Sequence, residues 1–189
     1  MPFTVQVATL DDVPMLNALI ARSARELSIG YYSPHQIEAA IRHVFGVDSR
    51  LVDDQTYYAV SEGEVLVACG GWSRRRTLYG GDQRPVGGIE WLSPETDAAK
   101  IRAFFVAPEH ARHGIGRLLL ATCVDAAREG GFSRLELMAT LPGVPLYAAM
   151  GFQRVQTVTD VLPDGTSIDF VQMERPVDHG GRRVDAGLA

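Results

Sequence analysis

The chain contains few cysteines and no long apolar run. Cys69 and Cys123 are the only cysteines among 189 residues and lack any Cys/His ligand spacing, so neither a disulfide framework nor a zinc site is expected. No segment approaches the ~20 consecutive apolar residues of a membrane span, and the N-terminus lacks the basic and apolar regions of a signal peptide. We therefore expect a cytoplasmic protein with no metal and no membrane partner.

The charge is too evenly balanced to favour a nucleic-acid partner. The formal net charge is −5 at pH 7, and the one basic run, 74–76, is better interpreted as the solvated end of a strand. A hydrophobic fraction of 46% and a charged fraction of 22% are those of a soluble globular domain. The length leaves room for one such domain. We expect it to cover 3–175, followed by a polar C-terminal tail over 176–189.

One stretch combines a strand, a glycine loop and a helix. The bulky apolar run 104–106 favours a buried strand, and Pro108 ends that strand because it lacks a backbone donor. From Ile115 onward the spacing predicts a helix that ends at 130–131. The residues expected on its buried face are Ile115, Leu118, Leu119, Thr122, Cys123 and Ala126.

The loop before this helix has the features of an anion site. Gly114 and Gly116 leave room for successive backbone N–H groups to turn toward one point. The unpaired donors and the positive dipole end of a helix start can hold a phosphate there. Arg112, His113 and Arg117 can add side-chain donors or charge. The loop alone is a weak signal, because Gly-x-Gly before a helix often serves only close packing.

The neighbouring residues exclude two common phosphate-binding motifs. A P-loop requires Gly-Lys-Ser/Thr, and no such sequence follows Gly116. A dinucleotide-binding fold requires a third glycine and an acidic residue at the end of the next strand, whereas here the helix continues as Arg-Leu-Leu-Leu. The loop is therefore of a different type.

The order of motifs over residues 100–155 resembles the GNAT superfamily of acyl-CoA N-acyltransferases. Pro-Glu-His-Ala-Arg-His-Gly-Ile-Gly-Arg-Leu-Leu links the strand to the helix, and Leu-Tyr-Ala-Ala-Met-Gly-Phe follows a further strand expected at 134–139. The family loop usually reads Gln/Arg-x-x-Gly-x-Gly/Ala, so Ala111 departs from it. Since the family binds pyrophosphate mainly through backbone N–H groups, Ala111 should weaken binding without abolishing it, and Arg112 beside it can supply the charge.

The resemblance implies an α/β fold with a mixed, mainly antiparallel sheet flanked by helices. Two parallel strands of that sheet are expected to splay apart and form a cleft for acetyl-CoA, the implied cosubstrate. The pantetheine arm would pair with the strand that ends at Val106, and the pyrophosphate would lie over 111–117. The implied cofactor contacts are Phe104, Phe105, Val106, Ala111, Arg112, His113, Gly114, Ile115, Gly116 and Arg117.

The resemblance also places Tyr147 at the family's general-acid position. A phenol with a pKa near ~10 is an adequate proton donor to a leaving thiolate. The general base stays open, because the cofactor-binding strand offers Lys100 and Arg102 but no acid. The alternatives nearby in the sequence are Glu90, Glu95, Asp97, His110 and Glu136.

The rest of the chain predicts the outer elements. Strands are expected at 3–8, 57–62, 65–75, 154–162 and 167–175, and helices at 12–26 and from 34 to about 45. Residues 46–55 are expected to form a polar connector anchored by Leu51 and Val52. Residues 77–99 are expected to form a long loop with a short strand at 88–92, able to fold over the acceptor. The expected buried face of the first helix is Met15, Leu16, Leu19, Ile20 and Ser23.

The acceptor is expected to be a small primary amine. Tyr31 and Tyr32 lie in a loop that borders the acceptor in the family, although packing or plain exposure is an equally good interpretation. Trp72 beside Gly70-Gly71 could wall the same pocket, with a core tryptophan as the slightly favoured alternative. The alternative functions are an acyl-CoA-binding sensor without turnover and an acetyltransferase of protein N-termini or lysines. The sequence leaves open whether the protein forms a homodimer.

Overall fold

The fold is described for residues 2–84 and 90–177 of a computed structural model. The strands are β1 (Phe3–Val7), β2 (Tyr57–Glu62), β3 (Val65–Ser73), β4 (Ala99–Val106), β5 (Arg134–Thr140), β6 (Gln153–Val161) and β7 (Ser167–Pro176). They form one seven-stranded sheet in the order β1-β2-β3-β4-β5-β7-β6. Every neighbouring pair is antiparallel except β4 and β5, which run parallel. The predicted mixed, mainly antiparallel sheet is confirmed.

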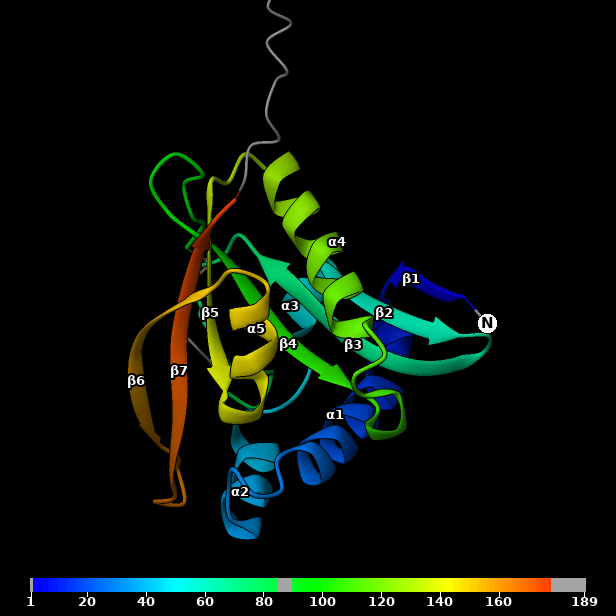
Figure 1. Cartoon of the computed structure of the whole chain (residues 1–189), viewed down its shortest axis with the longest axis vertical. Helices are drawn as coiled ribbons and strands as arrows, with labels where there is room; N and C mark the ends of the chain where they lie inside the picture. Colours follow the sequence, from blue (N-terminus) through cyan, green and yellow to red (C-terminus); the bar gives the residue numbers. More distant parts are fainter. Residues whose placement is uncertain (1, 85–89, 178–189) are drawn as a thin grey trace, which may run out of the picture.

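Helices cover both faces of the sheet. They are α1 (Val13–Leu27), α2 (Pro34–His43), α3 (Ser49–Asp53), α4 (Ile115–Glu129) and α5 (Val144–Ala149). Figure 1 shows α4 and α5 in front of the sheet and α3 behind it. Buried side chains from α1, α2 and α3 form one hydrophobic cluster with the sheet, and those of α4 and α5 contribute to the clusters on the other face. The predicted α/β domain is therefore built as a sheet between two helical layers.

The parallel strands β4 and β5 diverge after a short region of contact. They pair only over Ala99–Ile101 and Leu135–Leu137. On the other side of β4, the register with β3 shifts between Cys69 and Gly71. Ala103 lies in this irregular part of β4 and has a φ of 52°, in the left-handed region that non-glycine residues rarely adopt. The bulge therefore coincides with the point where the sheet opens, and the predicted splay is confirmed.

The adjacent glycines of β3 explain how the bulge packs. A Cβ added at Gly70 would lie 2.3 Å from the Phe104 ring, and one added at Gly71 would lie 2.3 Å from the backbone oxygen of Thr56. Both distances are far below van der Waals contact, so only glycine fits at either position. The expectation that this glycine pair marks a bulge or a close approach is confirmed, because it allows Phe104 to approach β3 closely.

The helix starts follow the expected capping chemistry. The Ser33 hydroxyl accepts a hydrogen bond of 3.2 Å from the backbone N–H of Gln36, and the Gln36 side chain accepts one of 2.9 Å from the Ser33 N–H. This reciprocal pair satisfies two donors at the start of α2. Thr9 and Asp12 form a similar pair ahead of α1. A side-chain cap therefore sets where α2 begins, and the Thr9–Asp12 pair sets where the 3-10 turn Leu10–Asp12 before α1 begins.

Two predicted helix faces were wrong by about one position. Met15 is 59% exposed and Leu118 is 38% exposed, although both were expected to be buried. In α4, Leu120 is fully buried and takes the place expected for Leu118. A helix rotates by 100° per residue, so an apolar residue at the edge of the hydrophobic stripe can face either the sheet or the solvent. Contacts with the sheet decide which one is buried.

The polar connector expected at 46–55 was also wrong, because it contains the short helix α3. Its start is capped by Asp48, whose carboxylate accepts a hydrogen bond of 3.2 Å from the Arg50 N–H. The expected anchors Leu51 and Val52 are buried. A five-residue helix has too few turns for its periodicity to show in the sequence.

The remaining boundaries differ only slightly from those expected. Part of the strand expected at 88–92 lies outside the described residues, and the described part forms a single bridge between Arg75 and Trp91. β7 includes Pro176, and Val177 is 3% exposed against the core, so the packed chain reaches beyond 175. The rest of the expected tail, 178–189, lies outside the described residues. In the described ranges, no helix combines the length and apolar character that crossing a membrane requires.

Candidate active site

The loop ahead of α4 is shaped by a residue in the left-handed conformation. Gly114 has a φ of 85° and caps the start of the helix, and a Cβ added there would meet nothing within 4 Å. The N–H of Leu118 makes the first helical bond, 3.1 Å to the Gly114 carbonyl. The N–H groups of residues 115–117 therefore precede the helical ladder and are the donors that a helix start offers to an anion.

Gly116 serves a different purpose from Gly114. A Cβ at Gly116 would lie 2.9 Å from the Cδ2 atom of Leu146, so the missing side chain lets α5 approach the first turn of α4. Gly114 thus sets the backbone conformation of the loop, and Gly116 sets the distance between the start of α4 and α5.

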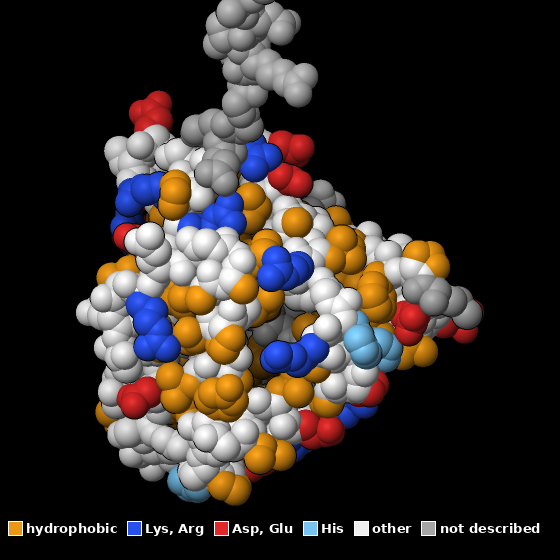
Figure 2. Space-filling view, viewed as in Figure 1, with side chains coloured by type: hydrophobic (Ala, Val, Ile, Leu, Met, Phe, Trp, Pro, Cys, Tyr) orange, Lys and Arg blue, Asp and Glu red, His pale blue; other side chains and the backbone are white. Residues whose placement is uncertain are grey.

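A cleft of about 520 Å³ opens in front of this loop. Figure 2 shows a hollow between α5 and the start of α4, with basic side chains on its rim and hydrophobic side chains on its walls. All the residues expected to contact a cofactor line this cleft except His113, which lies beside it with its ring centre 6.4 Å from that of His110. The structure therefore brings the strand end and the glycine loop to one site.

The cleft changes character along its length. Exposed Arg112 and Arg117 stand at the end formed by α4. Leu27 of α1 and Leu146 and Ala149 of α5 contribute apolar walls. Such a cleft suits an elongated ligand with an anionic end and a less polar arm.

A second, smaller cavity of about 60 Å³ lies in the gap between β4 and β5, and we call it the chamber. It shares four lining residues with the cleft, so the two spaces adjoin; these are Phe45, Phe104, Phe105 and Thr140. The other lining residues of the chamber are Val44, Gly46, Leu78, Tyr79, Gly80, Ile101, Arg102, Ala103, Met138, Tyr147 and Phe170.

Tyr147 of α5 lines the chamber from the α4 side of the sheet. Its ring centre lies 6.2 Å from that of Phe104 and 5.8 Å from that of Phe152, and the residue is 8% exposed. Within the described ranges no group forms a hydrogen bond with the Tyr147 hydroxyl. Burial raises the pKa of this hydroxyl well above its ordinary value. The phenol is thus neutral, and it is a weaker acid than the ordinary phenol on which the general-acid expectation rested.

The residues expected to border an acceptor lie in three different places. Tyr31 is half exposed and lines the cleft. Tyr32 is buried, and its hydroxyl donates to the Asp169 carbonyl at 2.7 Å and accepts from the Leu141 N–H at 2.9 Å. Trp72 is 6% exposed and packs in the core, 6.0 Å from the Phe132 ring. Neither Tyr32 nor Trp72 lines the cleft or the chamber.

The candidate bases considered from the sequence also lie outside the chamber. Among them, only His110 lines the cleft, where its Nε2 atom lies 3.1 Å from the Glu62 carboxylate. The Glu136 carboxylate binds Lys100 and Gln172, and Glu90 pairs with Arg76 at 2.6 Å. The Asp97 carboxylate accepts from the Ser93 N–H at 2.8 Å, and Glu95 is exposed. In residues 2–84 and 90–177, no three His, Cys, Asp or Glu side chains gather as metal ligands would.

Sequence reasoning missed most of the chamber walls. Phe45 follows α2, Tyr79 lies in the long loop after β3, and Phe170 belongs to β7. Because these residues lie far apart along the chain, no local sequence pattern indicated that they would meet. The only related expectation was that the 77–99 loop could cover an acceptor. The described part of that loop does reach the chamber at 78–80.

Comparisons with known proteins agree with this geometry. Residues 21–152 match the acetyltransferase (GNAT) family, while none of the curated proteins compared matches the sequence. A GCN5-related N-acetyltransferase from Rhodopseudomonas palustris is 17% identical, with a TM-score of 0.68 and coverage of 93% of this chain and 96% of the other. The PaiA N-acetyltransferase of Thermoplasma acidophilum, solved with coenzyme A, is 16% identical, with a TM-score of 0.64 and coverages of 93% and 99%.

A third similar structure is that of an enzyme named for a protein substrate. The ribosomal-protein-S18-alanine N-acetyltransferase of Escherichia coli is 16% identical, with a TM-score of 0.56 and coverage of 97% of this chain and 99% of the other. At such identities these structures share the fold alone. The family match covers most of the chain, including the glycine loop and Tyr147. The chain therefore belongs to the acetyltransferase (GNAT) family, whose members are acyltransferases.

Proposed function

We propose that this protein transfers the acetyl group of acetyl-CoA to the primary amine of a small molecule, with Tyr147 as the general acid. The observation that carries the proposal is the continuity of the site. The cleft leads from the unpaired N–H groups of 115–117 to the gap between β4 and β5, where Tyr147 lines the adjoining chamber. A cofactor bound by its phosphates at one end would present its thioester at the other.

The cofactor's phosphates are assigned to the start of α4. The N–H groups of 115–117 and the helix dipole favour an anion there, and Arg112 and Arg117 add positive charge. The pantetheine arm is assigned to the part of β4 beyond Ile101, where the strand has left β5. An extended amide-bearing arm can pair with such a free backbone edge.

In the proposed reaction the amine arrives unprotonated, and the Tyr147 phenolate formed during the reaction serves as the base. The neutral amine attacks the thioester carbonyl carbon, and the carbon–sulfur bond of the tetrahedral intermediate then breaks. The leaving sulfur takes the proton of the Tyr147 hydroxyl. The nitrogen loses one proton, which returns to the phenolate directly or through water. The products are the N-acetylated amine and CoA with a free thiol.

The small-amine assignment rests on the small size of the chamber. Loop residues 78–80 and the residues after α2 line it, and its volume is about 60 Å³. A peptide acceptor would require a long groove, whereas a space of this size suits a compact acceptor group. The alternatives are acetylation of a protein N-terminus or lysine, and an acyl-CoA sensor without turnover.

An acetylation screen tests the proposal. Wild-type protein is incubated with acetyl-CoA and small primary amines, amino acids, aminoglycosides or peptides, and both thiol release and the mass of the product are recorded. We expect equal amounts of CoA and an acetylated small amine. Far higher kcat/KM for peptides would favour the protein-directed alternative, and tight CoA binding without any acetylated product would favour the sensor.

A further inference from the structure

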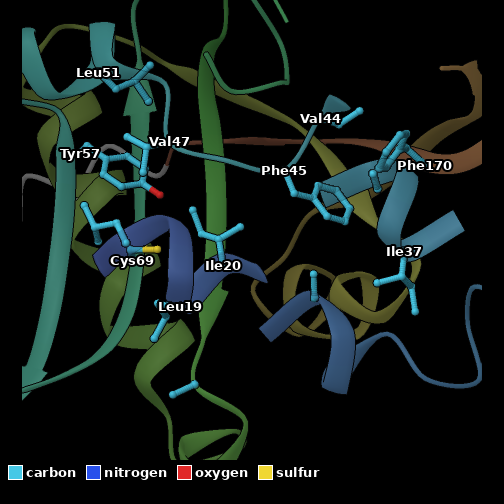
Figure 3. Packing of buried hydrophobic residues seen from close by; sticks show 14 of the residues in the cluster. Leu19, Ile20, Ile37, Val44, Phe45, Val47, Leu51, Tyr57, Cys69 and Phe170 are labelled. Carbon is cyan, nitrogen blue, oxygen red and sulfur yellow. The ribbon is translucent and has the colours of Figure 1, made fainter. Parts of the chain in front are cut away.

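Two loops form the wall of the chamber on the side of the sheet that faces α2, and we call them the wall loops. The first connects α2 to α3 over 44–48, and the second follows β3 over 77–84. Their lining residues are Val44, Phe45 and Gly46 of the first loop and Leu78, Tyr79 and Gly80 of the second. Figure 3 shows Phe45 near Phe170 of β7, and their ring centres lie 6.3 Å apart. The first wall loop therefore packs directly against the sheet.

The two wall loops are bonded to each other. The Gly81 N–H donates to the Val44 carbonyl at 3.0 Å, and the Asp82 N–H donates to the Val47 carbonyl at 2.9 Å. The Asp82 carboxylate also accepts from the N–H of Ser49 at 2.8 Å and from its hydroxyl at 3.0 Å. These bonds join segments that lie far apart along the chain, so the two loops form one continuous wall.

A single side chain of β4 holds both wall loops. The Arg102 guanidinium donates to the Asp48 carboxylate of the first loop at 3.0 Å. It also donates to the Thr77 carbonyl of the second loop at 2.9 Å and to the Gly80 carbonyl. The Arg102 and Asp48 side chains are each 2% exposed. Because Asp48 matches its charge within the protein, the planar guanidinium serves as a set of directed donors between the strand and the wall.

Arg102 lies where the sheet opens. Pairing of β4 with β5 ends at Ile101, and Ala103 has the left-handed φ of 52°. Beyond it, Phe104–Val106 line the cleft assigned to the cofactor arm. Arg102 thus connects the strand that would present the thioester to the wall that would face the acceptor.

We propose that Arg102 is a positioning residue for acetyl transfer, which holds the wall loops over the thioester so that an amine is aligned and water is kept out. This rests on the proposed acetyltransferase function. The chamber has only about 60 Å³, so even a small outward shift of its wall changes its shape. A misplaced amine reacts more slowly. A loosened wall also admits water, which competes for the thioester.

The two fates of acetyl-CoA give a direct readout of positioning. Attack by an amine on the thioester carbon breaks the carbon–sulfur bond and yields the N-acetylated amine and CoA. Attack by water breaks the same bond and yields acetate and CoA, and in both cases the sulfur takes a proton. The ratio of acetylated amine to acetate, corrected for spontaneous hydrolysis, does not depend on how much protein is folded. A general loss of stability therefore leaves this ratio unchanged.

Arg102→Lys gives the first test, with ethylamine as the probe amine. Lysine keeps a positive charge beside Asp48 but lacks the planar fork that reaches the two loop carbonyls. We expect the ratio of acetylethylamine to acetate to fall on the order of tenfold, with the Kd for CoA unchanged. A wild-type ratio in folded Arg102→Lys would overturn the inference and leave acetyl transfer established.

Arg75→Lys is the matched control for this substitution. The Arg75 guanidinium binds the Asp54 carboxylate through two bonds of 2.7 Å, and the two side chains are 14% and 9% exposed. Neither residue lines the chamber or the cleft. We expect Arg75→Lys to keep the wild-type ratio. An equal fall in both variants would contradict a specific role of Arg102.

Asp82→Ala tests the same wall without changing a buried charge. Asp82 is exposed, and the substitution removes the two bonds to Ser49. We expect a smaller fall of the ratio in the same direction. Asp125→Ala is its control, since the exposed Asp125 carboxylate binds Arg128 on α4 at 2.8 Å. Thermal melts report folding, and if Arg102→Lys does not fold, a wild-type ratio in Asp82→Ala overturns the inference.

A failure of the proposed function gives a different result. A wild-type protein that forms no acetylethylamine counts against a small-amine acceptor, and the rate of acetate formation then decides about Arg102. We expect this rate to be several-fold higher in Arg102→Lys than in wild type. Unfolding lowers this rate, so an increase reports the loosened wall. Equal rates of acetate formation in the two proteins would overturn the inference.

Discussion

The Tyr57 hydroxyl donates a hydrogen bond of 3.1 Å to the carbonyl oxygen of Ala103, a residue 46 positions further along the chain. Ala103 lies just beyond the last residue of β4 that pairs with β5, and it adopts the left-handed φ of 52°. Tyr57 is fully buried. The bond thus satisfies a carbonyl at the strained position from which the two strands diverge.

Removing this bond should weaken the fold. In Tyr57→Phe the partly buried Ala103 carbonyl loses this hydrogen bond, and we expect the free energy of unfolding to fall by about 1–3 kcal/mol. Urea unfolding measures this change. Tyr31→Phe is the control, because the Tyr31 side chain is 50% exposed and a surface change of this kind stays within about 0.5 kcal/mol. Equal losses of unfolding free energy in the two variants would show that the hydrogen bond to Ala103 does not stabilise the fold measurably.

Tyr147→Phe should separate catalysis from cofactor binding. The change deletes the hydroxyl assigned to protonate sulfur and keeps the ring that packs on Phe104 and Phe152. We expect kcat to fall about 10²–10⁴-fold, with the Kd for CoA little changed. Steady-state kinetics and calorimetry give the two numbers. A variant with wild-type kcat would mean that water or another group protonates the thiolate.

The protein should lose stability at alkaline pH partly through Tyr32. Burial raises the pKa of this hydroxyl from 10.0 to about 12, with the Leu141 N–H acting in the opposite direction. The folded state therefore keeps a proton that the unfolded chain loses above its ordinary pKa. The stabilising contribution is fully present below pH 10 and falls as the pH rises from about 10 to about 12.

The difference between wild type and Tyr32→Phe isolates this contribution. Other buried tyrosines also titrate, so both proteins should lose stability as the pH rises, but the wild type should lose it more steeply. Urea unfolding at a series of pH values supplies the slopes. Parallel slopes would show that Tyr32 titrates alike in the folded and unfolded states.

The glycine loop could be read from the sequence because its function depends on local chemistry. Gly114 precedes a periodic helix and Gly116 lies in its first turn, and their spacing with the strand before them is sufficient to predict a helix start that accepts an anion. The structure adds the reason for each glycine, a left-handed φ at Gly114 and contact with Leu146 at Gly116. Local motifs of this kind can be predicted from the sequence without knowledge of distant contacts.

The chamber could not be read in the same way. Phe45, Tyr79 and Phe170 come together because β7 lies between β5 and β6 and because the loop after β3 folds back over β4. Each residue taken singly is an ordinary aromatic in a strand, a loop or a helix end. Sheet order and loop packing are tertiary properties, and the pattern of any one segment does not contain them.

The charge of the α4 loop gives the most direct test of the acetyl-CoA site, because Gly114→Asp and Gly114→Asn differ mainly by a negative charge. Asn and Asp both tolerate the left-handed φ of 85° at this position, and a Cβ there has open space. If phosphates bind over residues 115–117, calorimetry should give Gly114→Asp a Kd for CoA at least about tenfold higher than Gly114→Asn, equal to ~1.4 kcal/mol. Equal Kd values in two folded variants would contradict the assignment of this cleft to the cofactor.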